Sequence, residues 1–306
     1  MSISTDQIIE TVKKIPEFAE SEILVERLFS GTNIVSLVKS NIGIVVFREF
    51  KLAKLIDTNR EREVFSLASE MGVGPRALVV EEKFRIEEFI QGQTMERTEC
   101  DKYLESTALA LSNFHSIPFP STKNSILCYL ENWKIQFELN FTPDRPDSQI
   151  IQFINSEWNT VLSLLVNDPE EFVLCHNDFS YGNLIITPLN VKIIDYDYSG
   201  LGHPSIDLAT FCIETMFDFS QPIYQFLPQD ELSKDQQQAF VQYYSKFANR
   251  DFEDLWKKFL RSKATVCFLG ALWAGCQYSE TNTSMLDYMR IRLNLYNKYK
   301  NELIFF

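Results

Sequence analysis

The most constraining feature of this 306-residue chain is a short run of polar residues between apolar segments in its second half. Asp178 follows the predicted strand 172–175, Asn183 comes five residues later, and Asp195 ends a further predicted strand, 191–195. Short strands that pair as a hairpin bring their ends close together. Carboxylate and amide oxygens are the ligands that Mg²⁺ prefers. The spacing therefore predicts one pocket in which three oxygen-bearing side chains surround a metal ion.

A metal ion held by these groups suits the transfer of a phosphoryl group. Such a transfer requires an oriented nucleophile and neutralised phosphate charge, and little covalent chemistry from the protein. Asp178, on a loop, is the candidate base that accepts the proton of an attacking hydroxyl, and Asn183 and Asp195 are the candidate Mg²⁺ ligands. Asp178 or Asn183 taken alone could simply shape a turn. The joint pattern with Asp195 favours catalysis.

Two neighbours of this motif have competing interpretations. His176 follows an apolar run, so hydrogen bonds that brace the loop are favoured over a role as a base. Asp207 precedes an apolar helical segment and could be the N-cap of that helix. It could equally support the catalytic loop from beneath, and the sequence leaves both roles open for Asp207.

Composition excludes several classes of partner and site. Lys and Arg total 29 against 42 Asp and Glu, a net charge of -13, which argues against binding to nucleic acid or to anionic lipid. The six cysteines lack metal-ligand spacing, and we expect them to be reduced core residues. The first 20 residues have no apolar signal segment, and no stretch of about 18 apolar residues occurs. These features predict a cytoplasmic protein without a membrane span.

Sequence periodicity changes near residue 90. Before it, residues 5–14 and 59–71 have helical spacing, and strand patterns occur at 23–29, 34–39, 42–50, 77–80 and 84–90. Beyond it, helical patterns dominate, at 104–115, 150–165, 264–276 and 285–299. We therefore predict an α+β protein with a sheet-rich N-terminal lobe, residues 1–90, and a mainly helical C-terminal lobe, residues 91–306.

Several segments together resemble a known family. The segments HNDFSYGN, IIDYDYSG and IDLATFCIE resemble the choline/ethanolamine kinase family, within the aminoglycoside-phosphotransferase-like group. The segments FSGTNIVSLV, VVFREF, FRIEEFIQG, LSNFHSIP and FLGALWAGCQY resemble that family in the same order, so the likeness covers about residues 22–299. It implies a two-lobed protein-kinase-like fold with an antiparallel sheet in the N-terminal lobe. It also implies ATP and Mg²⁺ as cofactors.

The resemblance assigns nucleotide-binding roles in the N-terminal lobe. Arg48 would contact phosphates and pair with Glu63, or with Glu61 as a substitute; an ordinary exposed ion pair is the alternative. Backbone groups of Glu88, Phe89 and Ile90 would bind adenine. The phosphates would be covered by Ser30, Gly31, Thr32 and Asn33, although this segment lacks the GxGxxG spacing and could be a plain hairpin turn.

The resemblance implies an amine acceptor, and ammonium groups are held by aromatic faces and carboxylates. Asp178 would meet its hydroxyl, and the candidates around its ammonium group are Tyr198, Glu214, Asp218, Phe219, Trp273 and Tyr278. Aromatic residues make up 13% of the chain, so each alone could be a core residue. The resemblance favours Tyr198 and Trp273. The chain departs from the family at Gly270, where a tryptophan is usual, and at Phe219, where a tyrosine is usual.

These observations predict an ATP- and Mg²⁺-dependent kinase of choline or ethanolamine, acting at the first step of phosphatidylcholine or phosphatidylethanolamine synthesis. One alternative is a kinase of another hydroxylated molecule, such as thiamine, an aminoglycoside or a sugar. The other is a catalytically silent kinase-like binding protein, which the presence of Asp178, Asn183 and Asp195 disfavours. The number of metal ions stays open, as does the oligomeric state, for which a homodimer is compatible with the sequence.

Overall fold

The chain forms two compact units, each assembled from two segments. A computed structural model describes residues 2–303 apart from 29–33, 51–55, 122, 142–147, 221–223 and 280–281. The first unit comprises Met1–Thr94 with Leu184–Tyr198, and the second comprises Met95–Asn183 with Ser199–Phe306. The first unit thus takes a hairpin from the second half of the chain. The lobes predicted from sequence, 1–90 and 91–306, stay a prediction.

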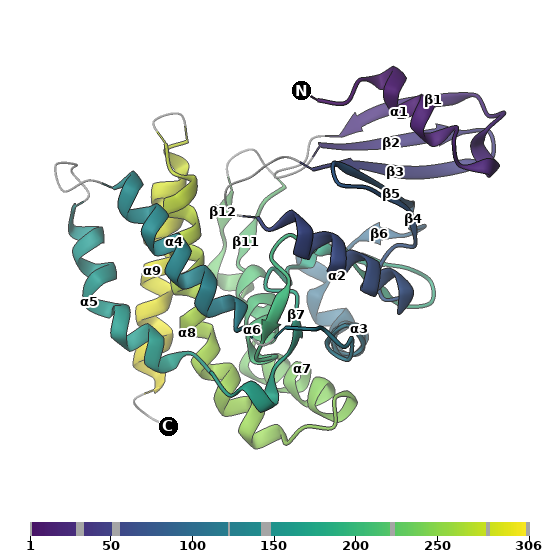
Figure 1. The fold of residues 1–306 in the computed structure, drawn as a ribbon. Helices are drawn as coiled ribbons and strands as arrows, with labels where there is room; N and C mark the ends of the chain where they lie inside the picture. Colours follow the sequence, from purple (N-terminus) through teal and green to yellow (C-terminus); the bar gives the residue numbers. More distant parts are fainter. Residues whose placement is uncertain are drawn as a thin grey trace. The chain divides into compact units, whose positions relative to one another are not determined.

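The first unit is built on a five-stranded antiparallel sheet, whose strand order is β1-β2-β3-β5-β4 (Figure 1). Its strands are β1 (Ile23–Leu28), β2 (Ile34–Ser40), β3 (Gly43–Glu49), β4 (Ala77–Val80) and β5 (Phe84–Glu88). In the β2–β3 hairpin, Ser40 pairs with Gly43, so two residues form the turn. The strand segments expected from the sequence are therefore present in this sheet.

Two helices accompany this sheet. Helix α1 (Thr5–Val12) begins with a capping box made by Ser4 and Gln7, and the short 3-10 helix η1 (Pro16–Phe18) follows it. Residues Ile8 and Val12 of α1 join the buried core of the unit with Val38, Val45, Phe47 and Ile86. Helix α2 (Thr58–Glu70) is capped by Asp57, whose side chain accepts the N–H groups of Asn59 and Arg60.

A three-stranded sheet places the Asp195 segment in this same unit. It consists of β6 (Gln93–Thr94), β8 (Leu184–Ile186) and β9 (Val191–Ile193), in the order β6-β8-β9. The N–H of Ile193 donates to the carbonyl of Val73 at 3.2 Å. Gly74 is required here, because a Cβ atom at this position would lie 2.0 Å from the Tyr196 hydroxyl. The turn after α2 is thereby packed against the segment that carries Asp195.

The second unit is mainly helical. Its helices are α3 (Leu104–His115), α4 (Ser125–Asn140), α5 (Ser148–Leu164), α6 (Ser205–Glu214), α7 (Lys234–Phe247), α8 (Phe252–Gln277) and α9 (Ser284–Glu302). Helix α8 is the centre of the unit, because it packs against α4, α5, α6, α7 and α9. Shorter 3-10 helices are η2 (Arg97–Tyr103), η3 (Pro169–Glu171), η4 (Tyr181–Asn183) and η5 (Pro228–Asp230).

Two small antiparallel ribbons complete the second unit. They pair β7 (Val173–Cys175) with β10 (Gly200–Gly202), and β11 (Phe217–Asp218) with β12 (Gln225–Phe226). The combination of an antiparallel sheet with many helices confirms the predicted α+β class. All six cysteines are free thiols, as expected.

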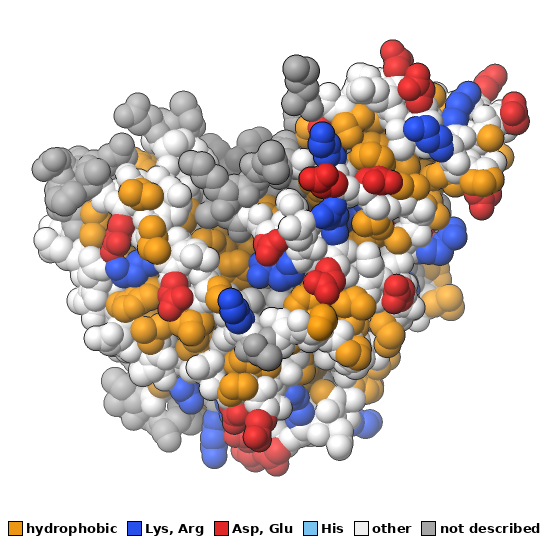
Figure 2. Space-filling model, viewed as in Figure 1, with side chains coloured by type: hydrophobic (Ala, Val, Ile, Leu, Met, Phe, Trp, Pro, Cys, Tyr) orange, Lys and Arg blue, Asp and Glu red, His pale blue; other side chains and the backbone are white. Residues whose placement is uncertain are grey.

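Charged side chains of both signs occur on the surface (Figure 2). On the face drawn in Figure 2, Lys and Arg side chains are interspersed with Asp and Glu side chains rather than gathered together. Among the helices in the described part of the chain, none is both long and apolar enough to cross a membrane.

Candidate active site

The loop between β7 and β8 holds Asp178 and Asn183 in direct contact. The side-chain amide of Asn183 donates to the backbone carbonyl of Asp178 at 2.9 Å and to its Oδ2 atom at 3.2 Å. Both side chains are half-buried. Because the amide nitrogen of Asn183 faces Asp178, its Oδ1 atom is left for another partner. The donor set therefore suits a hard cation on Asn183 and a hydrogen-bonded hydroxyl on Asp178.

Asp207 fixes the beginning of this loop. Its fully buried carboxylate accepts the N–H groups of His176 and Asn177 at 2.6 and 2.7 Å. Asn177 has a φ of 64°, a conformation that costs energy for a residue other than glycine and persists only when its surroundings enforce it. The N-cap position of α6 is occupied by Pro204, so Asp207 lies inside the helix. Of the two roles left open by the sequence, support of the catalytic loop is confirmed.

A second layer of hydrogen bonds orients Asp207. His115 Nε2 lies 2.9 Å from Asp207 Oδ2, and His115 Nδ1 lies 2.6 Å from the Tyr244 hydroxyl. Burial lowers the pKa of His115, although Asp207 acts in the opposite direction. A neutral His115 accepts a hydrogen bond from the Tyr244 hydroxyl at Nδ1 and donates one from Nε2 to Asp207. The group His115, Cys175 and Asp207 has the composition of a metal site, but His115 and Asp207 are already engaged in these hydrogen bonds.

His176 has the structural role that the sequence favoured. It is fully buried, and its ring lies 5.9 Å from the ring of Phe114 and 6.0 Å from that of Phe179. Its backbone N–H is the group bound by Asp207. The imidazole is therefore packed among aromatic rings of the core rather than presented as a base.

In the first unit, Asp195 forms an ion pair with Arg48. The distance between Arg48 Nη1 and Asp195 Oδ2 is 3.3 Å, and Arg48 is only 6% exposed. Burial lowers the pKa of Arg48, but Asp195 and Glu87 more than offset this and raise it overall. Asp195 has a φ of 68°, so the backbone of this candidate site residue is strained, as is that of Asn177. Arg48 therefore contacts a candidate metal ligand directly.

The predicted partner of Arg48 needs correction. Glu61 pairs with Arg85 of β5, which also pairs with Glu87 at 2.6 Å. Glu63 is exposed on α2. The Arg85 guanidinium is 4.0 Å from the centre of the Phe65 ring. Because Glu61 shares the buried face of α2 with Phe65, it meets Arg85, whereas Glu63 points to solvent.

The remaining nucleotide-binding predictions have different outcomes. Ser30, Gly31, Thr32 and Asn33 lie outside the described residues. The backbone N–H of Glu88 donates to the carbonyl of Arg76 at 2.9 Å, so it is already engaged within the first unit. Ile90 follows β5, and its role with adenine stays a prediction.

A cluster of aromatic rings in the second unit contains two of the predicted acceptor residues. We use the name "aromatic cluster" for Phe217, Phe219, Tyr224, Trp273 and Tyr288. The ring of Tyr288 is central, at 5.1 Å from Phe217, 4.9 Å from Tyr224, 6.2 Å from Phe219 and 6.3 Å from Trp273. The cluster thus brings Phe219 and Trp273 together around a residue that the sequence analysis missed.

Glu214 is linked to the aromatic cluster by an arginine, Arg292. Its Oε1 atom pairs with Arg292 Nη2, which also donates to the Tyr288 hydroxyl. Burial raises the pKa of Tyr288, and the carboxylates of Glu214 and Asp178 raise it further. Asp178 therefore lies within electrostatic reach of the cluster. Tyr288 and Arg292 are four residues apart on α9, a spacing that places them on one helix face and could have drawn attention to them.

Three further acceptor candidates are not members of the aromatic cluster. Tyr278 stacks on Phe141, with ring centroids 5.0 Å apart. The Asp218 side chain accepts the N–H of Ser220 at 2.9 Å and so shapes a turn. Tyr198 belongs to the first unit and is 9% exposed. Its contribution to an acceptor site stays a prediction.

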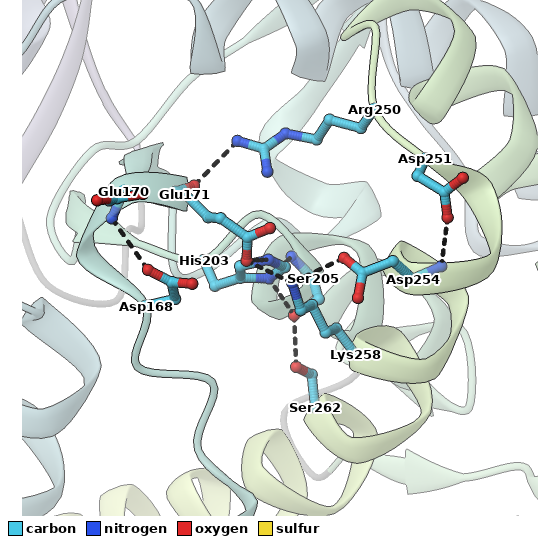
Figure 3. Close-up of polar contacts among 10 residues, drawn as sticks. All are labelled: Asp168, Glu170, Glu171, His203, Ser205, Arg250, Asp251, Asp254, Lys258 and Ser262. Atoms are coloured by element: carbon cyan, nitrogen blue, oxygen red, sulfur yellow. Dashed lines mark hydrogen bonds and ion pairs between the residues drawn. The ribbon is translucent and has the colours of Figure 1, made fainter.

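A buried polar group precedes α6, as Figure 3 shows. His203 Nε2 lies 3.2 Å from Glu171, and His203 Nδ1 lies 2.7 Å from the Ser205 hydroxyl. This order resembles a hydrolytic triad, but Ser205 is fully buried and its hydroxyl is also bonded to Ser262 at 2.6 Å. Burial is the main cause that lowers the pKa of His203, to about 3. The group is therefore structural and anchors the start of α6, the helix that carries Asp207.

Several known proteins are similar to this chain in sequence and in fold. A rat choline/ethanolamine kinase is 23% identical over 273 residues, which cover 80% of this chain and 69% of the relative. Human ethanolamine kinase 1 is 26% identical over 277 residues, covering 82% of this chain and 60% of the relative. The crystal structure of choline kinase from Cryptosporidium parvum superposes with a TM-score of 0.87 at 22% identity, covering 98% of this chain and 96% of that chain.

These features and the superposition define the kinase-like α+β fold. The family model described as choline/ethanolamine kinase matches residues 25–298. The chain therefore belongs to the choline/ethanolamine kinase family, and it is a nucleotide-using enzyme that phosphorylates an alcohol group.

Proposed function

We propose that this protein is an ATP- and magnesium-dependent kinase of a small amino alcohol, choline or ethanolamine. The observation that carries the proposal is the contact between Asp178 and Asn183, at 3.2 Å, on a loop anchored by Asp207. The aromatic cluster lies within electrostatic reach of the same Asp178. The relatives named above, which include choline and ethanolamine kinases, support this choice of acceptor.

The chain offers a group for each requirement of phosphoryl transfer. Asp178 accepts the hydrogen bond, and then the proton, of the acceptor hydroxyl as that oxygen attacks the terminal phosphorus of ATP. The bond between this phosphorus and the oxygen that bridges it to the β-phosphate breaks, and ADP leaves. Asn183 Oδ1 and the Asp195 carboxylate are hard oxygen ligands and would hold magnesium, which neutralises phosphate charge when bound. Arg48 adds a permanent positive charge beside Asp195. The product is the amino alcohol phosphorylated on its hydroxyl oxygen, a headgroup precursor for phosphatidylcholine or phosphatidylethanolamine.

An acceptor panel tests this proposal. Purified protein would be incubated with ATP and Mg²⁺ together with choline, ethanolamine, thiamine, an aminoglycoside or a sugar, and ADP release would be followed. We expect release above the acceptor-free rate with choline or ethanolamine. Release only with another acceptor would shift the assignment to that compound, and release with none would contradict kinase activity toward all five classes.

A further inference from the structure

The aromatic cluster already contains a cation that belongs to the protein. Arg292 is 1% exposed, and its guanidinium carbon lies 4.1 Å from the centre of the Phe217 ring and 4.8 Å from that of Tyr288. These distances are those of cation–π contacts. One face of each of these two rings is thereby covered by the arginine. Phe219 is 50% exposed, and Trp273 is partly exposed.

Arg292 also engages the carboxylate next to the cluster. Its Nη2 atom pairs with Glu214 Oε1, and both side chains are buried. Within the described part of the chain, Nε and Nη1 of Arg292 have no hydrogen-bond partner. The guanidinium is therefore held by Glu214, by the Tyr288 hydroxyl and by the two ring faces. Because Arg292 stays charged, its pairing cancels most of the negative charge that Glu214 would otherwise offer to an ammonium group.

Gly270 provides the space for this arrangement. A Cβ atom at this position of α8 would lie 3.1 Å from Arg292 Nε and 3.2 Å from Arg292 Cδ. These contacts are tight, so a larger residue would push the guanidinium away from its present place. The present position of Arg292 thus depends on the absence of a side chain at Gly270.

Neutralisation of Glu214 has different consequences for different amines. A primary ammonium group carries three N–H donors, and its desolvation is costly unless acceptors replace water. A quaternary ammonium group has no N–H donor and can be held by ring faces alone. We propose that Arg292 is a specificity-determining residue which, by pairing with Glu214, makes this enzyme favour quaternary over primary ammonium acceptors. This inference rests on the proposed function.

A methylation series provides the test. The kcat/KM values would be measured for ethanolamine, its N-methyl and N,N-dimethyl derivatives, choline, and 3,3-dimethylbutan-1-ol, the neutral isostere of choline. We expect kcat/KM to rise with each methyl group and to favour choline over ethanolamine by roughly tenfold or more, the range of a single cation–π or hydrogen-bond difference. Faster turnover of ethanolamine than of choline by the unmodified enzyme would overturn the inference.

The variant Arg292→Met tests the role of the guanidinium itself. Met keeps much of the length of the side chain but frees Glu214 to meet the acceptor. We expect the choline-to-ethanolamine ratio to fall several-fold, and the preference for choline over its neutral isostere to increase. Arg290→Met is the matched control, because Arg290 is exposed on the same helix and pairs with Asp287 at 3.4 Å. Both ratios should be unchanged in that control.

Gly270→Ala gives a second, independent variant in case Arg292→Met does not fold. The added methyl group should displace the guanidinium slightly and move the ratios in the same direction as Arg292→Met, by a smaller factor. Unchanged ratios in the folded variants would overturn the inference. Absence of turnover with every amine, by contrast, would count against the proposed function itself.

Discussion

Asp207 accepts the backbone N–H of His176 at 2.6 Å and so ties helix α6 to the loop that carries Asp178. We predict that Asp207→Asn lowers kcat at least about tenfold. The carboxylate accepts hydrogen bonds at both of its oxygen atoms, whereas an amide has only one oxygen and would turn its N–H₂ group toward one of the donors. Steady-state kinetics would measure the loss. The KM for ATP should change less than kcat, because the loop that Asp207 supports carries the candidate base Asp178. A full kcat in a folded variant would contradict the supporting role.

The hydroxyl of Tyr244 is predicted to act through His115. Tyr244→Phe removes the donor to His115 Nδ1, at present 2.6 Å away, and leaves a buried acceptor unsatisfied. Such a loss costs about 1–3 kcal/mol of unfolding free energy. Denaturant unfolding would measure it. The half-buried residue Tyr243, which directly precedes Tyr244, offers a Tyr→Phe control that should change the free energy by less than about 0.5 kcal/mol.

The ion pair between Arg85 and Glu61 should dominate the stability of the first unit. Both side chains are 1% exposed, so Glu61→Gln leaves a buried guanidinium partly uncompensated. Breaking one partner of a buried pair typically costs about 3–5 kcal/mol, and the remaining pair with Glu87 places our expectation at about 3 kcal/mol. Glu63→Gln is the matched control on α2 and should be nearly neutral, since Glu63 is exposed. Equal effects of the two substitutions would contradict the corrected pairing.

Buried histidines predict a specific dependence of stability on pH. The pKa of His203 is lowered to about 3 and that of His115 is also lowered, in both cases chiefly by burial. Below their ordinary pKa of 6.5, the unfolded chain therefore binds protons that the folded chain does not. Stability should be constant with respect to these groups above pH 6.5 and should fall as the pH is lowered from 6.5 toward 3.

The slope of this fall can reach about 1.4 kcal/mol per pH unit for each histidine. Thermal or denaturant unfolding between pH 6.5 and 5 would isolate it, because Asp and Glu in the unfolded chain titrate mostly below that range. His203→Gln should flatten the curve in this window. An unchanged slope would show that His203 is already protonated in the folded protein.

Local features of the site could be predicted from the sequence, whereas long-range contacts could not. Asp178 and Asn183 are five residues apart on one loop, so their contact follows from short-range spacing. The role of Asp207 depends on a loop 30 residues away, and the sequence left two alternatives. The strands of the first sheet were predicted because their apolar residues alternate and their turns contain recognisable residues.

Helix α2 shows how a pairing error arose. The sequence offered two glutamates, and Glu63 was favoured over Glu61 on the strength of a resemblance. The helical period alone points to Glu61, because it precedes the buried residues Val64, Phe65 and Ala68 by three, four and seven positions. Its partner, Arg85, lies on β5, where the sequence pattern indicates a strand and gives no sign of the ion pair. Charged residues on the buried face of a helix are thus predictable, but their partners require the fold.

Helix α4 was missed for a different reason. Apolar side chains occur on both sides of it: Trp133 and Phe137 are buried, whereas Ile135 is 60% exposed and Leu139 is 70% exposed. This distribution obscures the helical period. Arg292 was also unassigned, since nothing in its local sequence indicates a guanidinium packed between two rings.

The central claim is that Asp178 accepts the proton of an amino alcohol that attacks ATP. The most direct measurement is ³¹P NMR of the unmodified protein and of Asp178→Asn, each with ATP, Mg²⁺ and choline or ethanolamine, alongside a nucleotide-binding assay. We predict a phosphomonoester signal from the unmodified protein. In Asp178→Asn it should form about 10²–10⁴ times more slowly, with nucleotide binding retained. A phosphomonoester formed at the same rate by both proteins would contradict the assignment of Asp178, and none from the unmodified protein would contradict the proposed acceptors.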